Sequence, residues 1–144
     1  MIERAQIAAM IPHAGTMCLL ERVIRWDAQS IHCVASSHRA SRHPLADGEE
    51  LYSACGVEYA AQAIAVHGAL LGATDARPRA GYLVSVRALV LAVDRLDNVP
   101  GDLSIEAERL AGEETHMSYR FAVRGADRLL LHGRMAVVLE LGSS

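Results

Sequence analysis

A single carboxylate, Glu58, lies in a stretch dominated by small and apolar residues, 52–72. Burying an ionised carboxylate without partners is costly, so such a group is either protonated or bound by a donor. An apolar slot favours the protonated form of a carboxyl group, whereas the first turn of a helix favours the ionised form. We predict that Glu58 is a catalytic acid or base. The alternative is a structural carboxylate held by Gln62, one helical turn further on, or by an arginine.

Histidine readily exchanges a proton near neutral pH, and three histidines fall in predicted turns or loops before Glu58. His13 lies in an opening turn, and His38 and His43 share a later loop, so each is a candidate base. A zinc site at His38 and His43 is not favoured, because their loop has no cysteine and no second pair has ligand spacing. Three further histidines are expected to be packed or surface residues: His32, His67 and His116.

Covalent and cofactor chemistry have weaker support in the sequence. Cys55, one turn before Glu58, could form a nucleophilic pair with His43, but a buried free cysteine is usually a small hydrophobic residue. Ser53 lacks the G-x-S-x-G context of an elbow-type hydrolase. No glycine-rich phosphate-binding motif is present, so no nucleotide is indicated and we expect no cofactor.

The composition indicates one soluble domain over residues 1–144. A chain of 144 residues buries roughly 68–70% of its unfolded surface, which is sufficient for a stable core without disulfides or structural metals. Its net charge of −3 gives no footprint for nucleic acid, although all 14 basic residues are arginine. Three unpaired cysteines and the lack of a membrane-spanning stretch favour a cytoplasmic protein.

The elements that must position these residues can be read from periodicity and turn signals. Two helices are predicted, one at 2–10 that Pro12 and Gly15 end, and a long one at 53–71 that Gly72 closes. Loops are expected at 37–51 and 73–80. Alternating apolar runs between turn residues predict six strands: 23–27, 30–36, 81–93, 101–110, 115–124 and 128–141.

The order strand, strand, long helix and four strands predicts an α+β domain. One antiparallel sheet can wrap around the single central helix, which is the hot-dog layout. Because the last four strands are separated by short turns, we expect them to form an antiparallel meander.

Three segments carry a resemblance to the 3-hydroxyacyl-acyl-carrier-protein dehydratase family of bacterial fatty-acid synthesis. The opening 11–23, Ile-Pro-His followed by an apolar run and Glu-Arg-Val, is similar to the family's opening. Glu58-Tyr59-Ala60-Ala61-Gln62 resembles its Glu-x-x-Ala-Gln helix motif, and 83–87 with 100–103 resemble a later strand and its Pro-Gly-Asp turn. The Ile-Pro-His-Ala-Gly opening and residues 65–70 look closest to dehydratase-like subunits of bacterial aryl polyene clusters.

This resemblance implies elimination of water from a 3-hydroxyacyl chain on acyl carrier protein. A histidine would remove a carbon-bound proton, Glu58 would protonate the departing hydroxyl, and backbone N–H groups at the helix start would polarise the thioester carbonyl. His43 is the nearest match to the family's base, although the Gly and Phe that flank that base in the family are missing, so His38 and His13 stay open. Arg39 and Arg42 are candidates to meet the acidic carrier protein, and a solvated loop face is the alternative.

In the family, acid and base come from different subunits of a dimer. The departures around His43 therefore leave open whether this chain forms a homodimer, or a heterodimer with a related hot-dog subunit that completes a half-site. A subunit without activity of its own and a hot-dog thioesterase, in which Glu58 activates water, are the alternatives to a self-sufficient dehydratase.

Overall fold

A computed structural model describes residues 1–11, 17–40, 42–72, 80–112 and 116–140. The short elements before the long helix are β1 (Ile2–Glu3), α1 (Arg4–Met10), β2 (Arg22–Trp26), β3 (Ser30–Ala35) and the 3-10 helices η2 (Ser37–Arg39) and η3 (Ser53–Cys55). The long elements are α2 (Gly56–Gly72), β4 (Ala80–Leu91), β5 (Leu103–Gly112), β6 (His116–Gly125) and β7 (Arg128–Glu140). All six predicted strands and both predicted helices are therefore present, with ends shifted by a few residues. Pro12, Gly15 and the connection 73–79 lie outside the described residues.

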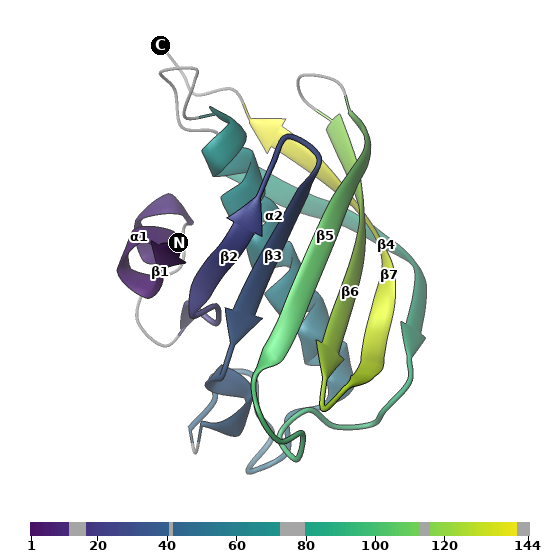
Figure 1. The fold of residues 1–144 in the computed structure, drawn as a ribbon. Coiled ribbons are helices and arrows are strands. Elements are labelled where there is room, and N and C mark those ends of the chain that lie inside the picture. Colours follow the sequence, from purple (N-terminus) through teal and green to yellow (C-terminus); the bar gives the residue numbers. More distant parts are fainter. Residues whose placement is uncertain (12–16, 41, 73–79, 113–115, 141–144) are drawn as a thin grey trace.

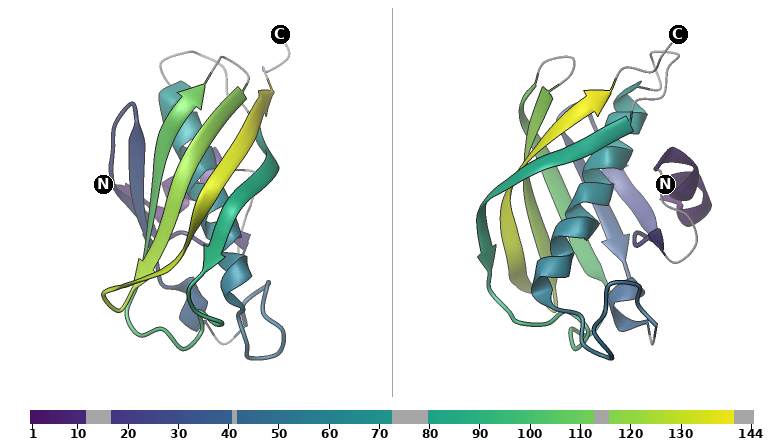
Figure 2. Two further views of the ribbon diagram at one scale, coloured as in Figure 1. Left: turned by 90° about the vertical axis from the view of Figure 1, so that its right-hand side faces the viewer. Right: turned by 180° about the vertical axis from the view of Figure 1, so that it is seen from behind.

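Seven antiparallel strands form one sheet in the order β1-β2-β3-β5-β6-β7-β4, and α2 crosses its concave face (Figures 1 and 2). This is the predicted arrangement of one sheet around one central helix. α1 packs beside β1, at the edge of the sheet opposite β4, and it also contacts α2.

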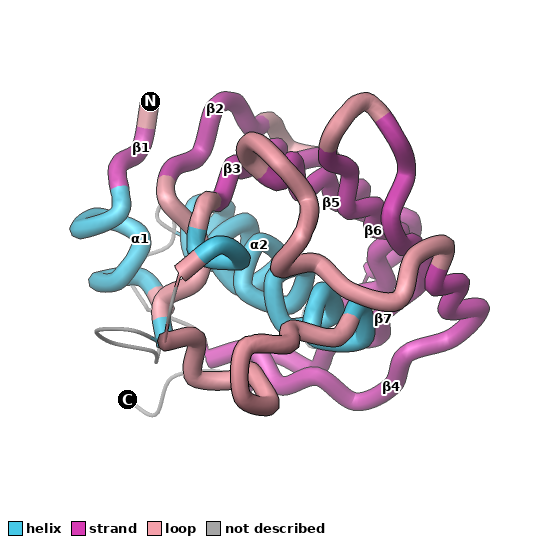
Figure 3. The backbone as a smooth tube through the Cα atoms, turned by 90° about the horizontal axis from the view of Figure 1, so that it is seen from below, coloured by secondary structure: helices cyan, strands magenta, loops and turns pink. Residues whose placement is uncertain are grey.

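The predicted four-strand meander is wrong for β4. Only β5, β6 and β7 follow one another in the sheet, while β4 pairs with β7 at the far edge and β5 pairs with β3. The connection between β4 and β5 is no tight hairpin, because it bonds to the loop before α2: Ser53 N–H donates to the Asp94 carbonyl, and Leu96 N–H to the Leu51 carbonyl. It thereby carries the chain beneath the helix start, at the end of the molecule seen in Figure 3.

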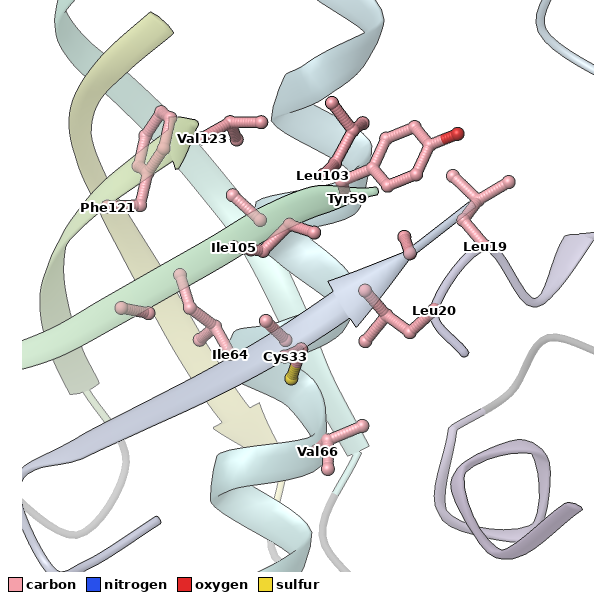
Figure 4. Packing of buried hydrophobic residues seen from close by; sticks show 14 of the residues in the cluster. Leu19, Leu20, Cys33, Tyr59, Ile64, Val66, Leu103, Ile105, Phe121 and Val123 are labelled. Atoms are coloured by element: carbon pink, nitrogen blue, oxygen red, sulfur yellow. The ribbon is translucent and has the colours of Figure 1, made fainter. Parts of the chain in front are cut away.

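Buried and solvent-accessible side chains alternate along the central strands, so one face of the sheet is buried and the other faces solvent. On β5 and β6 the inward side chains are buried, among them Ile105, Phe121 and Val123, and they pack with α2 (Figure 4). The outward positions carry charges that pair across strands, with 3.6 Å between Arg120 and Glu108 and 3.9 Å between Arg124 and Glu106. The sheet therefore buries one face only.

The helix α2 has no exposed residue between Gly56 and Gly72, as its composition predicts. Its first residue must be small, since a Cβ on Gly56 would lie 2.6 Å from Leu131 Cδ2 of β7. This close approach fixes the start of α2 against the sheet. No helix in the described part of the chain is long and apolar enough to cross a membrane.

A buried histidine ties the middle of α2 to the sheet. His67 is fully buried; its Nε2–H donates to the Asp27 carbonyl at 2.8 Å, so its Nδ1 accepts the Tyr119 hydroxyl proton at 2.6 Å. Burial lowers the pKa of His67 below its ordinary value of 6.5. The expectation that His67 is a packed histidine is confirmed, and His116 is an exposed one.

Acidification should destabilise the fold through this histidine. Below pH 6.5 the unfolded chain binds a proton that the folded chain resists at His67, so the free energy of unfolding falls as the pH falls. The loss is at most about 1.4 kcal/mol per pH unit for one such group. His67→Gln keeps an N–H donor for Asp27 but takes up no proton. Its urea-unfolding free energy should therefore depend less steeply on pH between about 7.5 and 5.5 than that of wild type; equal slopes would contradict this account.

Candidate functional site

The predicted acid lies at the start of α2. Glu58 is in the first helical turn and half-buried. Gln62, four residues on and therefore on the same helix face, donates from Nε2 to Glu58 Oε1 at 3.4 Å. The proposed structural partner of Glu58 is thus present.

Gln62 also binds the backbone of the opening segment. Its Oε1 accepts the Leu19 N–H at 2.9 Å, and its Nε2 donates to the Met17 carbonyl at 2.7 Å. The amide is 1% exposed, so these bonds are formed away from water. They dock residues 17–19 onto α2.

The residue after Glu58 connects α2 to His43. Tyr59 is buried, and its hydroxyl lies 2.9 Å from His43 Nε2 and 2.7 Å from Ser37 Oγ. Successive residues of a helix point in directions about 100° apart, so the Tyr59 side chain leaves α2 on a different side from the Glu58 side chain.

The donor and the acceptor can be assigned for each hydrogen bond that links His43, Tyr59 and Ser37. Leu45 N–H donates to His43 Nδ1 at 3.0 Å, so the ring proton is on Nε2 and is donated to Tyr59. Ser37 Oγ–H donates to the Leu19 carbonyl at 2.8 Å, so Ser37 accepts the Tyr59 proton. Both nitrogens of His43 are engaged within the chain itself.

Burial holds His43 in this neutral form. Desolvation lowers its pKa, and the neighbouring His38 lowers it further. A proton on Nδ1 would in addition face the Leu45 N–H, another donor. For His43 to accept a proton, its bond with Leu45 or with Tyr59 must first break.

Two cavities of about 270 and 240 Å³ adjoin His43, and Glu58 lines neither. Ser36, Ser37 and Arg42 line the larger one, and His38, Arg95 and Asp97 the smaller one. His43 and His38 thus line one cavity together, while Glu58 lines neither of these two cavities in the described part of the chain.

His38 is the third predicted candidate, and it is 1% exposed. Its Nε2–H donates to the Val99 carbonyl at 3.0 Å, which leaves the Nδ1 lone pair buried without a hydrogen-bond donor. Desolvation lowers the pKa of His38. His13 lies outside the described residues.

The nucleophile and metal alternatives gain no support from the described residues. Burial raises the pKa of the Cys55 thiol, and its Sγ lies 3.8 Å from the Leu45 carbonyl, so it is held as a thiol. Among these residues no group of three His, Cys, Asp or Glu side chains could hold a metal ion.

Sequence reasoning missed the hydrogen bonds of the Tyr59 hydroxyl with His43 and Ser37. A tyrosine in a buried helix must place its hydroxyl on a partner, which is a signal that such a group exists. The partners are 16 and 22 residues away, and no short-range pattern identifies them.

The family model of the ApeP dehydratases, described as ApeP-like, matches residues 5–140. The chain belongs to the ApeP-like dehydratase family. The predicted resemblance to dehydratase-like subunits of aryl polyene clusters is therefore confirmed. A comparison with curated proteins gives no match.

Solved structures confirm the hot-dog fold that this ApeP-like chain was expected to have. It is similar to the dehydratase heterocomplex ApeI:P from Xenorhabdus doucetiae, with 22% identity over 93% of this chain and 90% of that chain and a TM-score of 0.81. A variant thioesterase from Pseudomonas aeruginosa gives 14% identity over 97% and 95% of the two chains and a TM-score of 0.68. A hypothetical thioesterase with coenzyme A from Streptococcus pneumoniae is 10% identical over 85% of this chain and 88% of that chain, with a TM-score of 0.62.

Removing the Tyr59 hydroxyl should destabilise the ApeP-like fold. Tyr59→Phe leaves the His43 N–H without an acceptor in a buried site, so we expect the free energy of unfolding to fall by about 1–3 kcal/mol in urea titrations. Tyr52→Phe is the matched control, because the Tyr52 side chain is 45% exposed and its hydroxyl donates to Glu50 at 2.7 Å near the surface. Its effect should stay within about 0.5 kcal/mol; equal losses in the two variants would contradict the assignment.

Proposed function

We propose that this chain is a subunit of a dehydratase that removes water from a 3-hydroxyacyl thioester carried on acyl carrier protein, in aryl polyene-type biosynthesis. Glu58 is the acid that protonates the departing hydroxyl. Membership of the ApeP-like family supports the reaction class. The position of Glu58 supports its role, because the carboxyl group lies half-buried in the first turn of α2 and is hydrogen-bonded by Gln62.

The reaction needs one base and one acid. A base takes the proton from carbon 2 of the acyl chain, the freed electron pair forms the double bond to carbon 3, and the carbon 3–oxygen bond breaks. Glu58 gives its proton to the leaving hydroxyl, which departs as water, and the proton held by the base then restores Glu58. The thioester carbonyl, which accumulates negative charge, would be bound by backbone N–H groups at the start of α2.

The observation that carries the proposal of a shared site is the state of His43. Its two nitrogens already bind Leu45 and Tyr59, and Glu58 lines neither cavity beside it. A second copy of this chain would present the same engaged histidine. We therefore infer that the base comes from a different but related hot-dog subunit, and that this chain contributes the acid. A homodimer using His43 stays the second reading.

The open edge of the sheet supports such a pairing. Within the described residues β4 pairs with β7 alone, and it exposes three large apolar side chains, Leu89, Val90 and Leu91, at 39–47%. An apolar edge strand is a ready template for pairing with another chain. The similar ApeI:P structure is itself a dehydratase heterocomplex.

The carrier protein is proposed to dock near the loop that holds Arg42. Arg42 is exposed at the rim of the larger cavity, whereas Arg39 is paired with Asp102 at 3.3 Å. Among the described residues no ion pair of Arg42 is found, and an arginine without such a partner is the better one for an acidic carrier.

Mass spectrometry of a 3-hydroxyacyl-acyl carrier protein tests the function directly. The chain should remove water together with a related hot-dog subunit from the same host, and Glu58→Gln should lower the rate by roughly 100-fold or more, since the variant has no proton to give. Glu106→Gln is the control, because Glu106 is equally half-buried but lies on the outer face of β5.

Other outcomes of this assay separate the alternatives. Loss of water by this chain alone, abolished in His43→Gln, would establish the homodimer. Release of the free acid would establish the thioesterase. No reaction in any combination would refute the dehydratase.

The β4 edge gives a second prediction, on assembly. Val90→Lys places a charge on the proposed contact and should weaken association with the related subunit at least 10-fold in light-scattering titrations. Ile24→Lys is the control, since Ile24 is similarly exposed at 41% but lies on β2, far from β4 in the sheet order. Equal binding by both variants would exclude this edge as the contact.

A further inference from the structure

Three arginines lie directly opposite one another on the outer face of the sheet. Arg120 of β6 is opposite Arg134 of β7, and Arg134 is opposite Arg87 of β4. All three side chains are exposed, and the row ends at β4, the edge strand beside β7 (Figure 2, left). Like charges directly opposite each other on neighbouring strands are destabilising. The row therefore does not serve the stability of the isolated chain.

Only the inner end of this arginine row is neutralised. Arg120 lies 3.6 Å from Glu108 of β5, whereas no ion pair of Arg134 or Arg87 is found among the described residues. Positive charge accumulates at this edge, although the whole chain has a net charge of −3. The neighbouring outward positions of β4 and β7 carry no carboxylate: Ser85, Val90, His132 and Ala136.

A bulge in β4 places Arg87 beside an exposed apolar side chain. Arg87 and Val90 are three residues apart on β4, but they face Arg134 and His132, which are two residues apart on β7. The extra residue bends the backbone at Ala88, whose φ of 52° is uncommon for a residue other than glycine. Because Arg134 and His132 share the outer face, Arg87 and Val90 also share it. The edge thus presents a positive charge and an apolar group together.

The sequence of β4 decides which kind of strand can pair with this edge. Arg87 is the one charged residue in Ala80–Leu91. If two copies of this chain paired through β4, neither strand could offer a carboxylate to the other, and two arginine rows would meet. Such a meeting of like charges disfavours the pairing.

A strand with acidic side chains fits the same edge. Side chains opposite each other on neighbouring strands lie about 4.5–5.5 Å apart at Cβ, which is within reach of an Arg–carboxylate pair. An Asp or Glu on the outer face of a partner's edge strand would therefore neutralise Arg87 and reduce the repulsion along the row.

We propose that the row of Arg87, Arg134 and Arg120 selects the partner at the β4 edge. It accepts a related hot-dog subunit whose edge strand carries carboxylates on its outer face, and it opposes pairing of two copies of this chain. The inference rests on the proposed function, which names the related subunit as the partner.

Charge reversal tests the attraction. The Arg87→Glu variant should bind the related subunit from the same host at least 10-fold more weakly in calorimetric titrations at about 0.1 M NaCl. Wild-type affinity should fall about 10-fold between about 0.05 and 0.5 M NaCl, because salt screens exposed charges. Arg25→Glu is the matched control, since Arg25 is also exposed but lies on β2, far from β4 in the sheet order. It should change the affinity by less than about 2-fold.

Charge removal tests the repulsion. Arg87→Val leaves β4 without a charged residue, so in sedimentation experiments without the related subunit it should dimerise at least 10-fold more tightly than wild type. Arg25→Val should not differ from wild type. A gain of association cannot come from a lost contact, and an unchanged urea-unfolding midpoint would show that the variant is folded.

The outcomes separate this inference from the proposed function. A complex that removes water but binds Arg87→Glu as tightly as wild type would overturn the selection by arginine while the function stands. Equal self-association of wild type and Arg87→Val would overturn it as well. Weaker binding of acyl carrier protein to Arg87→Glu, with unchanged binding of the related subunit, would assign the row to the carrier and overturn the proposal. A complex that depends on Arg87 but removes no water would support the selection and refute the dehydratase.

Discussion

A buried amide side chain imposes the constraint on which the rest of the site depends. Gln62 is withdrawn from water, and an amide left without partners in such a place costs about 1–3 kcal/mol for each unmade bond. It meets this demand by binding the backbone at Met17 and Leu19, which brings the opening segment onto α2. The carbonyl of Leu19 is then available to Ser37, and through Tyr59 the loop with His43 takes its place. Three stretches distant in the sequence thus meet at the first turns of one helix.

The elements that periodicity governs could be predicted from the sequence. The first half of β5 and most of β6 alternate between buried and more exposed positions, and α2 carries small apolar residues on every side, so their types follow from local pattern. The placement of β4 could not be predicted, since it depends on hydrogen bonds between the β4–β5 connection and the loop before α2. Such bonds join segments more than forty residues apart and leave no periodic signal.

The candidate site shows the same division. The residue type and setting of Glu58 single it out, and its contact with Gln62 follows from helical spacing. The state of His43 does not follow from the sequence, because it depends on a backbone N–H at Leu45 and on the direction of the Ser37 hydroxyl. The sequence pattern of a histidine in a polar loop predicts a base. Whether a nitrogen lone pair of that histidine is available for a proton depends on the hydrogen-bond donors around the ring. His13 stays a prediction.

The charged outer face of the sheet affects how copies of the protein can associate with one another. Its cross-strand pairs of Arg120 with Glu108 and Arg124 with Glu106 are about half exposed, and pairs of this kind add little to the stability of a fold. What they do is keep the broad surface of the sheet hydrated. Face-to-face stacking of two such sheets would strip water from the four charges of each sheet at once, which is prohibitively costly. Growth into layered aggregates is thereby blocked in one direction.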